Sequence, residues 1–418
     1  ARWAQAWPAR RRKMHPYRFA LVIVALALVL SVLNWRLRGV GHDPLTLARI
    51  ALLRSRPMVH VCLSTDDENL VGLKAAIASV ITNALEPSMI TFHVVVPLAL
   101  AEYVDAELRT MALLDYGSDL EVVPLAAKLE TRLGKLVPQH ESSLHTIFNF
   151  VPFYLDVILG GAGIERVVYL DTDVLVLDDV AQLAAMDLQG FPAGVAEDCS
   201  QWYSTYFKNW KQVMKITAQL ARLRNNSYFD YKRVDRRKCV FNRGVFVMDT
   251  ALWRRMRVAR EIEFWTDYSN KVMRLWRDGV SQPPWLLSVG ALGFHKIGRP
   301  WNNRGLSRSP RLGMGLRETL TMGKLMRTWN ISQNEFVALG LDTRLTFLAL
   351  DAVNASAIHF NGPNKPWLNK SCGVSHCTVR PESLGDFAQQ CPTHPLSNGL
   401  HFVECRDLWL HYSRLASG

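Results

Sequence analysis

The chain has 418 residues, of which 49% are hydrophobic and 21% are charged, so it can fold into one large or two ordinary domains. This composition excludes an intrinsically disordered protein. The net charge of +12 is typical of nucleic-acid-binding proteins, but residues 1–56 carry +10 of it and residues 57–418 only +2. The body of the chain is nearly neutral, so we expect no nucleic-acid partner.

Residues 19–35 form an uncharged apolar run of 17 residues, FALVIVALALVLSVLNW, near the lower length limit of a membrane-spanning helix. Basic residues crowd its N-terminal side, which favours a cytosolic tail over 1–18 and an exported body. We therefore expect a transmembrane signal-anchor at 19–35 and a stem over 36–56. A cleaved signal peptide is the main alternative, although no small-x-small site closely follows the run. A buried core helix is the other.

Sequons and cysteines agree with an exported body. Four N-x-Ser/Thr sequons occur, at Asn225, Asn330, Asn354 and Asn369. The seven cysteines suit an oxidising compartment. Cys62 lies in an apolar run and is expected to be a buried free thiol, which leaves Cys199 and Cys239 as a candidate pair, with the connectivity open. Zinc binding is the less favoured alternative for the other four cysteines, because their spacing lacks the paired C-x₂-C pattern of zinc sites: Cys372, Cys377, Cys391 and Cys405.

Strands and helices alternate through the first half of the body. Apolar runs predict strands at 57–64, 89–96 and 120–124, and helical periodicity predicts helices at 70–84, 98–113 and 142–159. This alternation predicts an α/β fold with a mainly parallel sheet flanked by helices. The acidic turn after the first strand lies on the edge where such sheets bind ligands. Asp66 and Asp67 in this turn either cap the next helix or bind a base or ribose.

The apolar run at 167–177, VVYLDTDVLVL, is broken once by two carboxylates, Asp171 and Asp173. An unpaired ionised Asp inside a buried strand is energetically costly. We therefore place both residues where the strand ends, at the carboxyl edge of the sheet. Two carboxylates at alternate positions suit a hard divalent cation. The alternative is that this Asp-x-Asp pair arises by chance.

The second half of the body contains strands at 193–196, 240–248 and 355–360 and a helix at 252–273. The first of these strands runs into Asp198, and the second is interrupted by Asn242 and Gly244, which indicates close backbone approach to another group. A turn at 281–285 leads into a further helix. The aromatic and basic stretch at 201–237 has no clear period and is either an acceptor-binding lid or a packed excursion.

The last strand ends at His359, and Lys365 follows six residues later in HFNGPNKPW. Two Asp residues and a neutral imidazole suit Mn²⁺, which accepts oxygen and nitrogen ligands. A lysine beside the metal would offset the charge of a diphosphate and help to stabilise a departing nucleoside diphosphate. Alternatively, His359 is a satisfied core histidine and Lys365 a solvated charge.

Five separated motifs now resemble those of the family 8 retaining glycosyltransferases, which have the GT-A (Rossmann-like) fold, and they occur in the same order. They are STDDENLVG at 64–72, YLDTDV at 169–174, FNRGVFVMD at 241–249, RPWNNRGL at 299–306 and HFNGPNKPW at 359–367. The resemblance covers roughly residues 57–370 and leaves a cysteine-containing C-terminal extension at 371–418. It is closest to the single-pass eukaryotic branch, in which Cys199 and Cys239 fall at cysteine positions, so it favours their pairing.

The resemblance implies roles for individual residues. Mn²⁺ would be bound by Asp171, Asp173 and His359. The donor nucleotide would be held by Asp66 and Asp67 at its nucleoside and by Gly362 and Lys365 at its diphosphate. Asn242 and Asp198 would lie near the donor sugar or the acceptor, and Gln282 at the reacting face of the sugar. One departure is Pro152, in VPFYL, where family members often carry an Arg that helps to hold the nucleotide.

The function implied is that of a Golgi membrane protein of type II, with the endoplasmic reticulum as the alternative compartment. It would transfer a sugar from a UDP-sugar to a glycan or other acceptor, with retention and with Mn²⁺ as cofactor. No residue is an obvious strong nucleophile, so front-side attack is expected. The rival is a catalytically weak, family 8-like binding or scaffold protein, favoured by Pro152. A metal-dependent hydrolase would need more carboxylates or histidines near Asp171.

Overall fold

The computed structural model describes residues 58–66, 70–138, 146–224, 227–277, 280–304, 332, 355–362, 365–367, 376–379, 394–395 and 401–417. The chain divides into two units, Ala1–Pro57 and Met58–Gly418, and all of these residues belong to the second. No helix within these ranges is long and apolar enough to cross a membrane. The predicted tail, signal-anchor and stem lie outside them and stay predictions.

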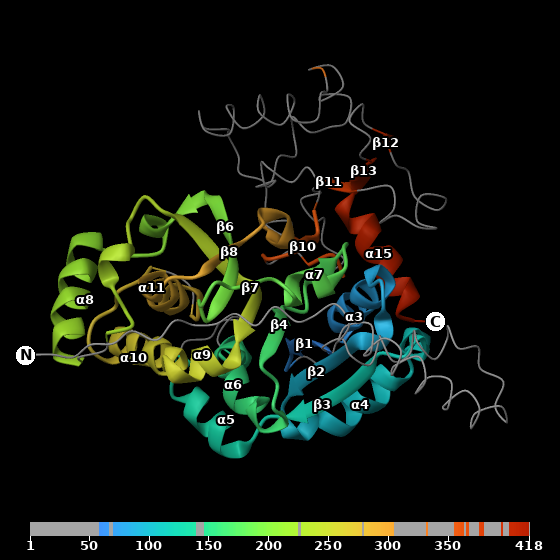
Figure 1. Cartoon of the computed structure of the whole chain (residues 1–418), viewed down its shortest axis with the longest axis horizontal. Helices are drawn as coiled ribbons and strands as arrows, with labels where there is room; N and C mark the ends of the chain where they lie inside the picture. Colours follow the sequence, from blue (N-terminus) through green and yellow to red (C-terminus); the bar gives the residue numbers. More distant parts are fainter. Residues whose placement is uncertain are drawn as a thin grey trace, which may run out of the picture. The chain divides into compact units, whose positions relative to one another are not determined.

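The described strands form three sheets (Figure 1). They are β1 Val59–Ser64, β2 Ile90–Val96, β3 Asp119–Pro124, β4 Arg166–Leu170, β5 Val174–Val176, β6 Ala193–Trp202, β7 Cys239–Asp249, β8 His295–Ile297, β9 Asn303–Arg304, β10 Ala357–His359, β11 His376–Val379, β12 His394–Pro395 and β13 His401–Glu404. The main sheet has the order β3-β2-β1-β4-β7-β6-β8, and the smaller sheets are β5-β10-β9 and β11-β13-β12.

Helices alternate with the strands along the chain. The α-helices are α3 Val71–Asn83, α4 Ala101–Arg109, α5 Ala127–Gly134, α6 Leu155–Ile158, α7 Val180–Ala184, α8 Trp210–Arg224, α9 Thr250–Arg255, α10 Val258–Lys271, α11 Gln282–Leu292 and α15 Cys405–Leu415. The 3₁₀ helices are η1 Pro87–Met89, η2 Leu98–Leu100, η3 Ala112–Tyr116, η4 Ile147–Asn149, η5 Val151–Tyr154, η6 Gly160–Ala162, η7 Tyr203–Thr205, η8 Tyr231–Arg233 and η9 Arg299–Asn302.

The main sheet is mostly parallel, which confirms the predicted α/β class. β1 pairs in parallel with β2 and β4, β2 with β3, and β6 with β8. β7 is the exception, because it runs antiparallel to both of its neighbours, β4 and β6. The antiparallel β7 therefore brings its own first half beside the carboxyl end of β4, where the two aspartates follow.

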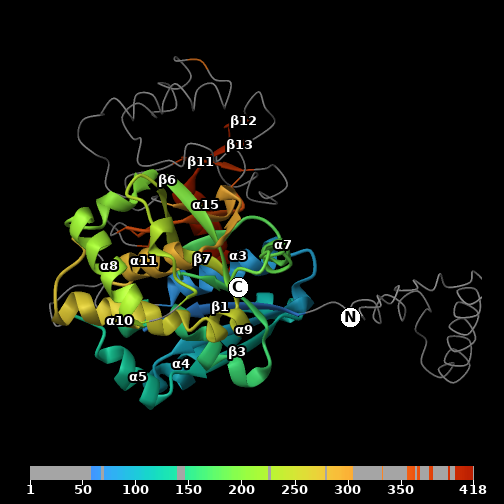
Figure 2. The same cartoon turned by 60° about the vertical axis from the view of Figure 1, so that its left-hand side comes forward.

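Apolar side chains cover both faces of the sheet, because helices pack on each of them (Figures 1 and 2). Along β7, Val245 and Val247 point into one core, together with residues of α3, α4 and α7. The alternate residues Phe246 and Met248 point into the other, together with residues of α5, α6, α9, α10 and α11. This double burial explains why the central strands read as continuous apolar runs.

The prediction of one long helix over 142–159 is wrong. From Thr146 onward the segment consists of η4, η5 and the single turn of α6. Pro152 stands in the first turn of η5, where it has no N–H to donate and restricts Val151 before it, so a helix cannot run through this point. The apolar residues are nevertheless buried in the core, because the short turns direct Phe153 and Leu155 inward.

Two further segments differ from their predicted extent. β6 continues past residue 196 to Trp202, with register shifts against β7 on either side of the pairs formed by Glu197 and Asp198. The predicted helix at 252–273 is two helices, α9 and α10, separated at Arg257, whose φ of 56° is left-handed. A left-handed residue ends the first helix and re-aims the chain before the second.

The stretch at 201–237 contains the helix α8, which its sequence did not reveal. Val213 and Ile216 of this helix are buried in the core, as are Phe207 and Tyr231 in the turns on either side. These contacts support the packed-excursion interpretation for the described part of this stretch. The helix is hard to recognise because the stretch at 201–237 also contains turns rich in aromatic residues, which have no helical period.

The small sheet β5-β10-β9 brings His359 beside the turn that carries the two aspartates. β10 runs antiparallel to β5, with His359 opposite Val174 and Ile358 opposite Leu175. The amide of Phe360 donates to the carbonyl of Asp173 at 2.9 Å. Residues far apart in the sequence thus become neighbours at the point where β4 has ended.

α15 lies within the predicted C-terminal extension but packs against the body of the domain, beside α3 (Figure 1). Asn83 Nδ2 of α3 donates to the Tyr412 hydroxyl at 2.7 Å. The buried face of α15 shares one apolar cluster with β5 and β10, and this cluster includes Leu175, Ile358, Leu408, Trp409 and Tyr412. The helix therefore covers the strand pair that carries His359.

The cysteine predictions have different outcomes. Cys62 is free and fully buried, as predicted, and burial raises the pKa of its thiol. Cys239 is disulfide-bonded. The side chains of Cys199 and of the four C-terminal cysteines lie outside the description, so the Cys199–Cys239 pairing stays a prediction.

Candidate functional site

Asp171 and Asp173 stand in the turn between β4 and β5, where the sheet ends. The amide of Asp171 donates to the carbonyl of Gly244 in β7 at 2.8 Å, and Val174 donates to Asp171 at 3.1 Å. The side chains are 20% and 11% exposed, so they reach solvent only slightly. The predicted placement at the carboxyl edge is confirmed.

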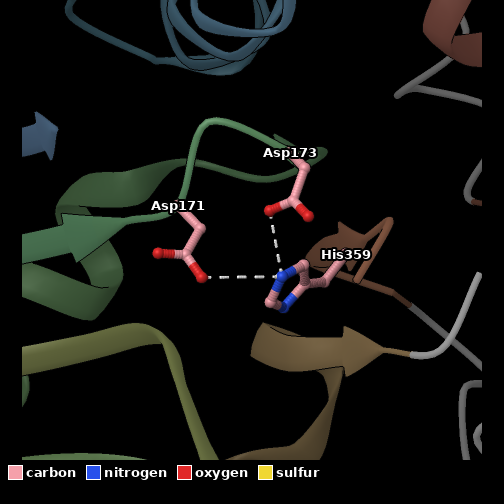
Figure 3. Close-up of side chains that lie close together, drawn as sticks. All are labelled: Asp171, Asp173 and His359. Carbon is pink, nitrogen blue, oxygen red and sulfur yellow. Dashed lines mark ion pairs between the residues drawn. The ribbon is translucent and has the colours of Figure 1, made fainter. Parts of the chain in front are cut away.

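His359 joins these carboxylates from β10 (Figure 3). Its Nε2 lies 3.0 Å from Asp173 Oδ1 and 3.8 Å from Asp171 Oδ2. One potential ligand atom from each of the three residues lies within 4.8 Å of the others. The imidazole is 1% exposed and points into the gap between the aspartates, so it is not simply a core histidine with a distant partner.

Asn302, in η9, orients the imidazole. The His359 Nδ1 atom lies 3.1 Å from Asn302 Oδ1. Because an amide oxygen only accepts, this contact places a proton on Nδ1 and directs Nε2 toward the carboxylates. A hydrogen bond on the far ring nitrogen is the usual arrangement behind a metal-binding histidine.

Gly244 fits the donor set to a small cation. A Cβ atom on Gly244 would lie 2.3 Å from His359 Cε1 and 2.6 Å from Asp171 Oδ2. Only a residue without a side chain leaves these groups room to converge. Two carboxylates and one imidazole in such a cradle match the ligand chemistry of Mn²⁺.

Lys365 contacts the same cluster from the turn after β10. Its ammonium group pairs with Asp173 Oδ2 and also donates to the carbonyl of Phe360 at 2.9 Å. Burial by itself raises the pKa of Asp173, but the Lys365 ammonium group and the His359 ring beside it outweigh burial and hold that pKa well below its usual range. Asp173 is therefore ionised at neutral pH. Gly362, which starts the turn, has a φ of 137° that disfavours other residues.

Trp367, the last residue of the HFNGPNKPW motif, fixes the turn that carries Lys365. A Cβ atom on Gly72 of α3 would lie 2.9 Å from the Trp367 ring and 3.0 Å from the carbonyl oxygen of Thr172. Trp367 therefore packs into the angle between α3 and the Asp-Thr-Asp turn. Trp367 also packs against Trp409 of α15, with ring centroids 5.6 Å apart. The position of Lys365 thus depends on α3 and α15.

Asn242 and Gln282 also lie beside the cluster. Asn242 Oδ1 accepts from the amide of Gly244 at 2.7 Å and from Asn302 Nδ2 at 3.5 Å. Gln282, at the start of α11, donates to the carbonyl of Phe241 at 2.5 Å and accepts from the amide of Arg243 at 3.3 Å. Both predicted residues therefore contact the part of β7 that faces Asp171.

The other predicted residues are less tied to the cluster. Asp198 pairs through its backbone with Val240 of β7, and its side chain lies outside the description. Asp66 is exposed, and its carboxylate accepts from the Thr146 hydroxyl. Asp66 does not cap α3, because that helix begins after Leu70 with no side-chain cap. Asp67 lies outside the described residues.

Sequence reasoning missed two donors to Asp171. The Tyr169 hydroxyl donates to Asp171 Oδ1 at 3.0 Å, and Arg243 Nη1 donates to the same oxygen at 3.1 Å. Burial, aided by the charge of Asp171, raises the pKa of Tyr169, so its hydroxyl keeps its proton. The only indication of these contacts in the sequence was the polar break at Asn242–Gly244 in β7. It predicted that the backbone there approaches another group closely, but not that this group is Asp171.

Comparisons with known proteins give a family-model match and several curated relatives. The family model described as glycosyl transferase family 8 matches residues 60–371. The probable galacturonosyltransferase-like 10 of Arabidopsis thaliana is 28% identical over 272 residues, which are 64% of this chain and 68% of that protein. The probable galacturonosyltransferase-like 7 of the same plant is 31% identical over 252 residues, 60% of this chain and 62% of that protein.

Solved structures give weaker similarities. The galactosyltransferase LgtC aligns with a TM-score of 0.46 and 19% identity over 75% of this chain and 91% of its own. Mouse xyloside xylosyltransferase 1 aligns with a TM-score of 0.43 and 15% identity over 74% of this chain and 99% of its own. The family model spans most of the chain and includes the Asp171, Asp173 and His359 cluster, and the chain belongs to glycosyl transferase family 8.

Proposed function

We propose that the protein is a retaining glycosyltransferase of the GT-A class that transfers a sugar from a UDP-sugar to a glycan or other acceptor and depends on Mn²⁺. The observation that carries the proposal is the convergence of Asp171, Asp173 and His359 with Lys365 beside them. Family 8 membership supports a sugar donor and a glycan acceptor. The metal and the nucleotide are inferred from the chemistry of the four side chains.

In this proposal Asp171, Asp173 and His359 hold the cation. When bound, the cation would neutralise charge on the donor diphosphate as its bond to the sugar breaks. Lys365 supplies a second positive charge at the same place, and its contacts with Asp173 and with the carbonyl of Phe360 help to keep it there.

The sugar would lie over β7 and the start of α11, next to Asn242 and Gln282. Both are uncharged amides fixed by hydrogen bonds to β7 or its neighbours. Neither is a strong nucleophile, so a covalent sugar intermediate on them is unfavourable. We therefore propose front-side attack by the acceptor, in which these amides orient the sugar and the acceptor hydroxyl. Asp198 lies further along the same strand pair and is proposed to face the acceptor.

The nucleoside would lie at the end of β1, where Asp66 and Asp67 follow the strand. The exposed carboxylate of Asp66 is near the end of a parallel strand, as ligand-binding residues of α/β sheets usually are. Because the relatives are named galacturonosyltransferase-like, UDP-galacturonate is the first donor to test. We propose a type II membrane protein on the basis of the apolar run at 19–35, and the Golgi as its compartment on the basis of the family resemblance.

The test is UDP release by the purified full chain, with Mn²⁺ and a panel of UDP-galacturonate, UDP-galactose, UDP-glucose and UDP-xylose. We expect release with one donor, dependence on acceptor, and loss of at least about 100-fold in Asp171→Asn and Asp173→Asn. Asp105→Asn removes a carboxylate from an exposed ion pair on α4 and is the matched control. The configuration of the product, read by NMR, tests retention.

The other outcomes separate the rival functions. Binding of UDP without turnover of any donor would favour the binding or scaffold protein. Sugar release that does not depend on an acceptor would favour hydrolysis. UDP release that is insensitive to both aspartate substitutions would overturn the assignment of the metal site.

A further inference from the structure

Arg243 of β7 is held beside the metal cluster by contacts to three different segments. Its Nη1 donates to Asp171 Oδ1 at 3.1 Å, and its Nη2 donates to Asn149 Oδ1 in η4. Its Nε donates to the Ser281 hydroxyl at 2.9 Å, immediately before α11. The side chain is 12% exposed. The guanidinium therefore has a fixed orientation, and each of its three nitrogens has a partner.

Because Arg243 contacts only Oδ1 of Asp171, the two carboxylate oxygens have different partners. Oδ1 accepts from Arg243 and from the Tyr169 hydroxyl, whereas Oδ2 faces His359 Nε2 at 3.8 Å. Two donors on one oxygen fix the rotation of the carboxylate. The other oxygen is then aimed at the gap between His359 and Asp173, where the proposed cation would bind.

Arg243 also links the metal cluster to α11, through both its backbone and its side chain. The backbone amide of Arg243 donates to Gln282 Oε1 at 3.3 Å, and its Nε holds Ser281. A shift of Asp171 would therefore move Arg243 and, through it, the start of α11, beside the residues proposed to face the sugar. A lysine could not replace this linkage, because its single nitrogen lacks the planar fork that reaches Asp171, Asn149 and Ser281 together.

We propose that Arg243 is a positioning residue for metal binding: it fixes Asp171 so that Oδ2 is presented to the cation, and it couples that carboxylate to α11. This inference rests on the proposed function, since it assumes a cation at the cluster. The competing explanation is a purely structural cross-link between η4, β7 and α11, which would affect unfolding but leave the cation affinity unchanged.

The experiment measures Mn²⁺ binding to the full chain directly, by electron paramagnetic resonance of free Mn²⁺, together with thermal unfolding in the presence of EDTA. The variants are Arg243→Met, which keeps most of the apolar volume, and Arg243→Lys, which keeps the charge. Arg132→Met is the matched control, because Arg132 makes a two-pronged pair with Glu263 between α5 and α10, apart from the cluster.

We expect Arg243→Met to weaken Mn²⁺ binding by about tenfold or more, as loss of groups that orient metal ligands usually does. Arg243→Lys should fall between Arg243→Met and the parent, because it restores charge without the fork. Arg132→Met should bind Mn²⁺ like the parent. With the donor identified, Arg243→Met should need more Mn²⁺ for half-maximal rate and regain part of its kcat when Mn²⁺ saturates.

The possible failures are distinguishable. A parent chain that binds no Mn²⁺ overturns the proposed metal dependence itself. A parent that binds Mn²⁺ and a folded Arg243→Met that binds it within twofold of the parent overturn the role of Arg243. If Arg243→Met does not fold, the combined Asn149→Ala and Ser281→Ala variant decides, because it removes two of the three side-chain contacts that hold the guanidinium in its fixed orientation against Asp171. Weaker Mn²⁺ binding by that variant supports the proposal, and unchanged binding overturns it.

Discussion

Gly244 lies so close to His359 that a Cβ atom at residue 244 would sit 2.3 Å from Cε1 of the imidazole. The same atom would lie 2.6 Å from Asp171 Oδ2. Both distances are far below van der Waals contact, and both partners are held by other groups, His359 by Asn302 and Asp171 by Arg243 and Tyr169. His359 and Asp171 can therefore converge only because residue 244 has no side chain.

We predict that Gly244→Ala lowers Mn²⁺ affinity and transferase activity by at least about tenfold, because the methyl group pushes His359 away from the aspartates. Calorimetric titration with Mn²⁺ checks the first effect and UDP release the second. Gly161→Ala is the control, since a Cβ atom there meets no atom within 4 Å. Parent-like Mn²⁺ affinity in Gly244→Ala would mean that the ligands converge elsewhere.

Lys365 should matter for the departure of the nucleotide. We predict that Lys365→Met lowers kcat/KM for the UDP-sugar by about 100-fold, because one preorganised positive charge is lost where the diphosphate develops negative charge. Lys365→Arg should retain more of the activity. Lys271→Met, which breaks an exposed ion pair within α10, is the matched control. The prediction fails if Lys365→Met changes kcat/KM no more than that control.

Asp156 should make stability depend on pH. Burial raises its pKa from 3.8 to about 6, although Arg254, with Nε 3.6 Å from the carboxylate, opposes the shift. The native state then binds more protons than the unfolded state between these values, so stability falls as the pH rises from about 4 to about 6. The loss is at most about 3 kcal/mol and is complete above the folded pKa.

The substitution Asp156→Asn removes this titration. Relative to the variant, the parent should therefore lose stability as the pH increases through this range, and the difference should be constant above about pH 7. Thermal or denaturant unfolding at a series of pH values measures it. A difference that is the same at pH 4 and pH 7 would show that the carboxylate is not perturbed.

Trp409 should stabilise the domain and hold the donor at the same time. We predict that Trp409→Ala lowers the free energy of unfolding by about 3 kcal/mol, because it leaves a cavity in the cluster of α15, β5 and β10. The KM for the donor should also rise. Trp367 loses its ring partner and shifts, and Lys365, which lies in the same turn, shifts with it. Tyr103→Ala, at an aromatic residue 45% exposed on α4, is the control for both measurements. An unchanged KM would limit α15 to a role in stability.

The sequence predicted for a physical reason that the carboxylates of Asp171 and Asp173 lie at the end of a strand. Carboxylates cannot interrupt a buried strand, so Asp171 and Asp173 had to lie at its end, and His359 and Lys365 occupy the corresponding place after the last strand. The α/β class followed from the alternation of apolar runs with helical periods. These arguments use only local pattern and the cost of burying charge.

What the sequence did not predict depends on pairing over long distances. Arg243 meets Asp171 because β7 runs antiparallel to β4, and that direction is not readable from either strand alone. No single helix runs over 146–159, because Pro152 interrupts the chain there although the apolar residues around it have helical periodicity. α8 was missed because its apolar positions, such as Val213, were hidden among aromatic residues that anchor the neighbouring turns.

The pairing of Leu175 with Ile358 has a consequence for biosynthesis. About 180 residues separate the two strands, so a chain made from its N-terminus holds both aspartates long before the histidine exists. Until α15 follows, the apolar faces of β5 and β10 have no cover from Leu408 and Trp409. Translation that stops before α15 would leave this apolar surface exposed, where chaperones and proteases can recognise it. The apolar cluster of β5, β10 and α15 is thus complete only after Leu408, Trp409 and Tyr412 have been added to the chain.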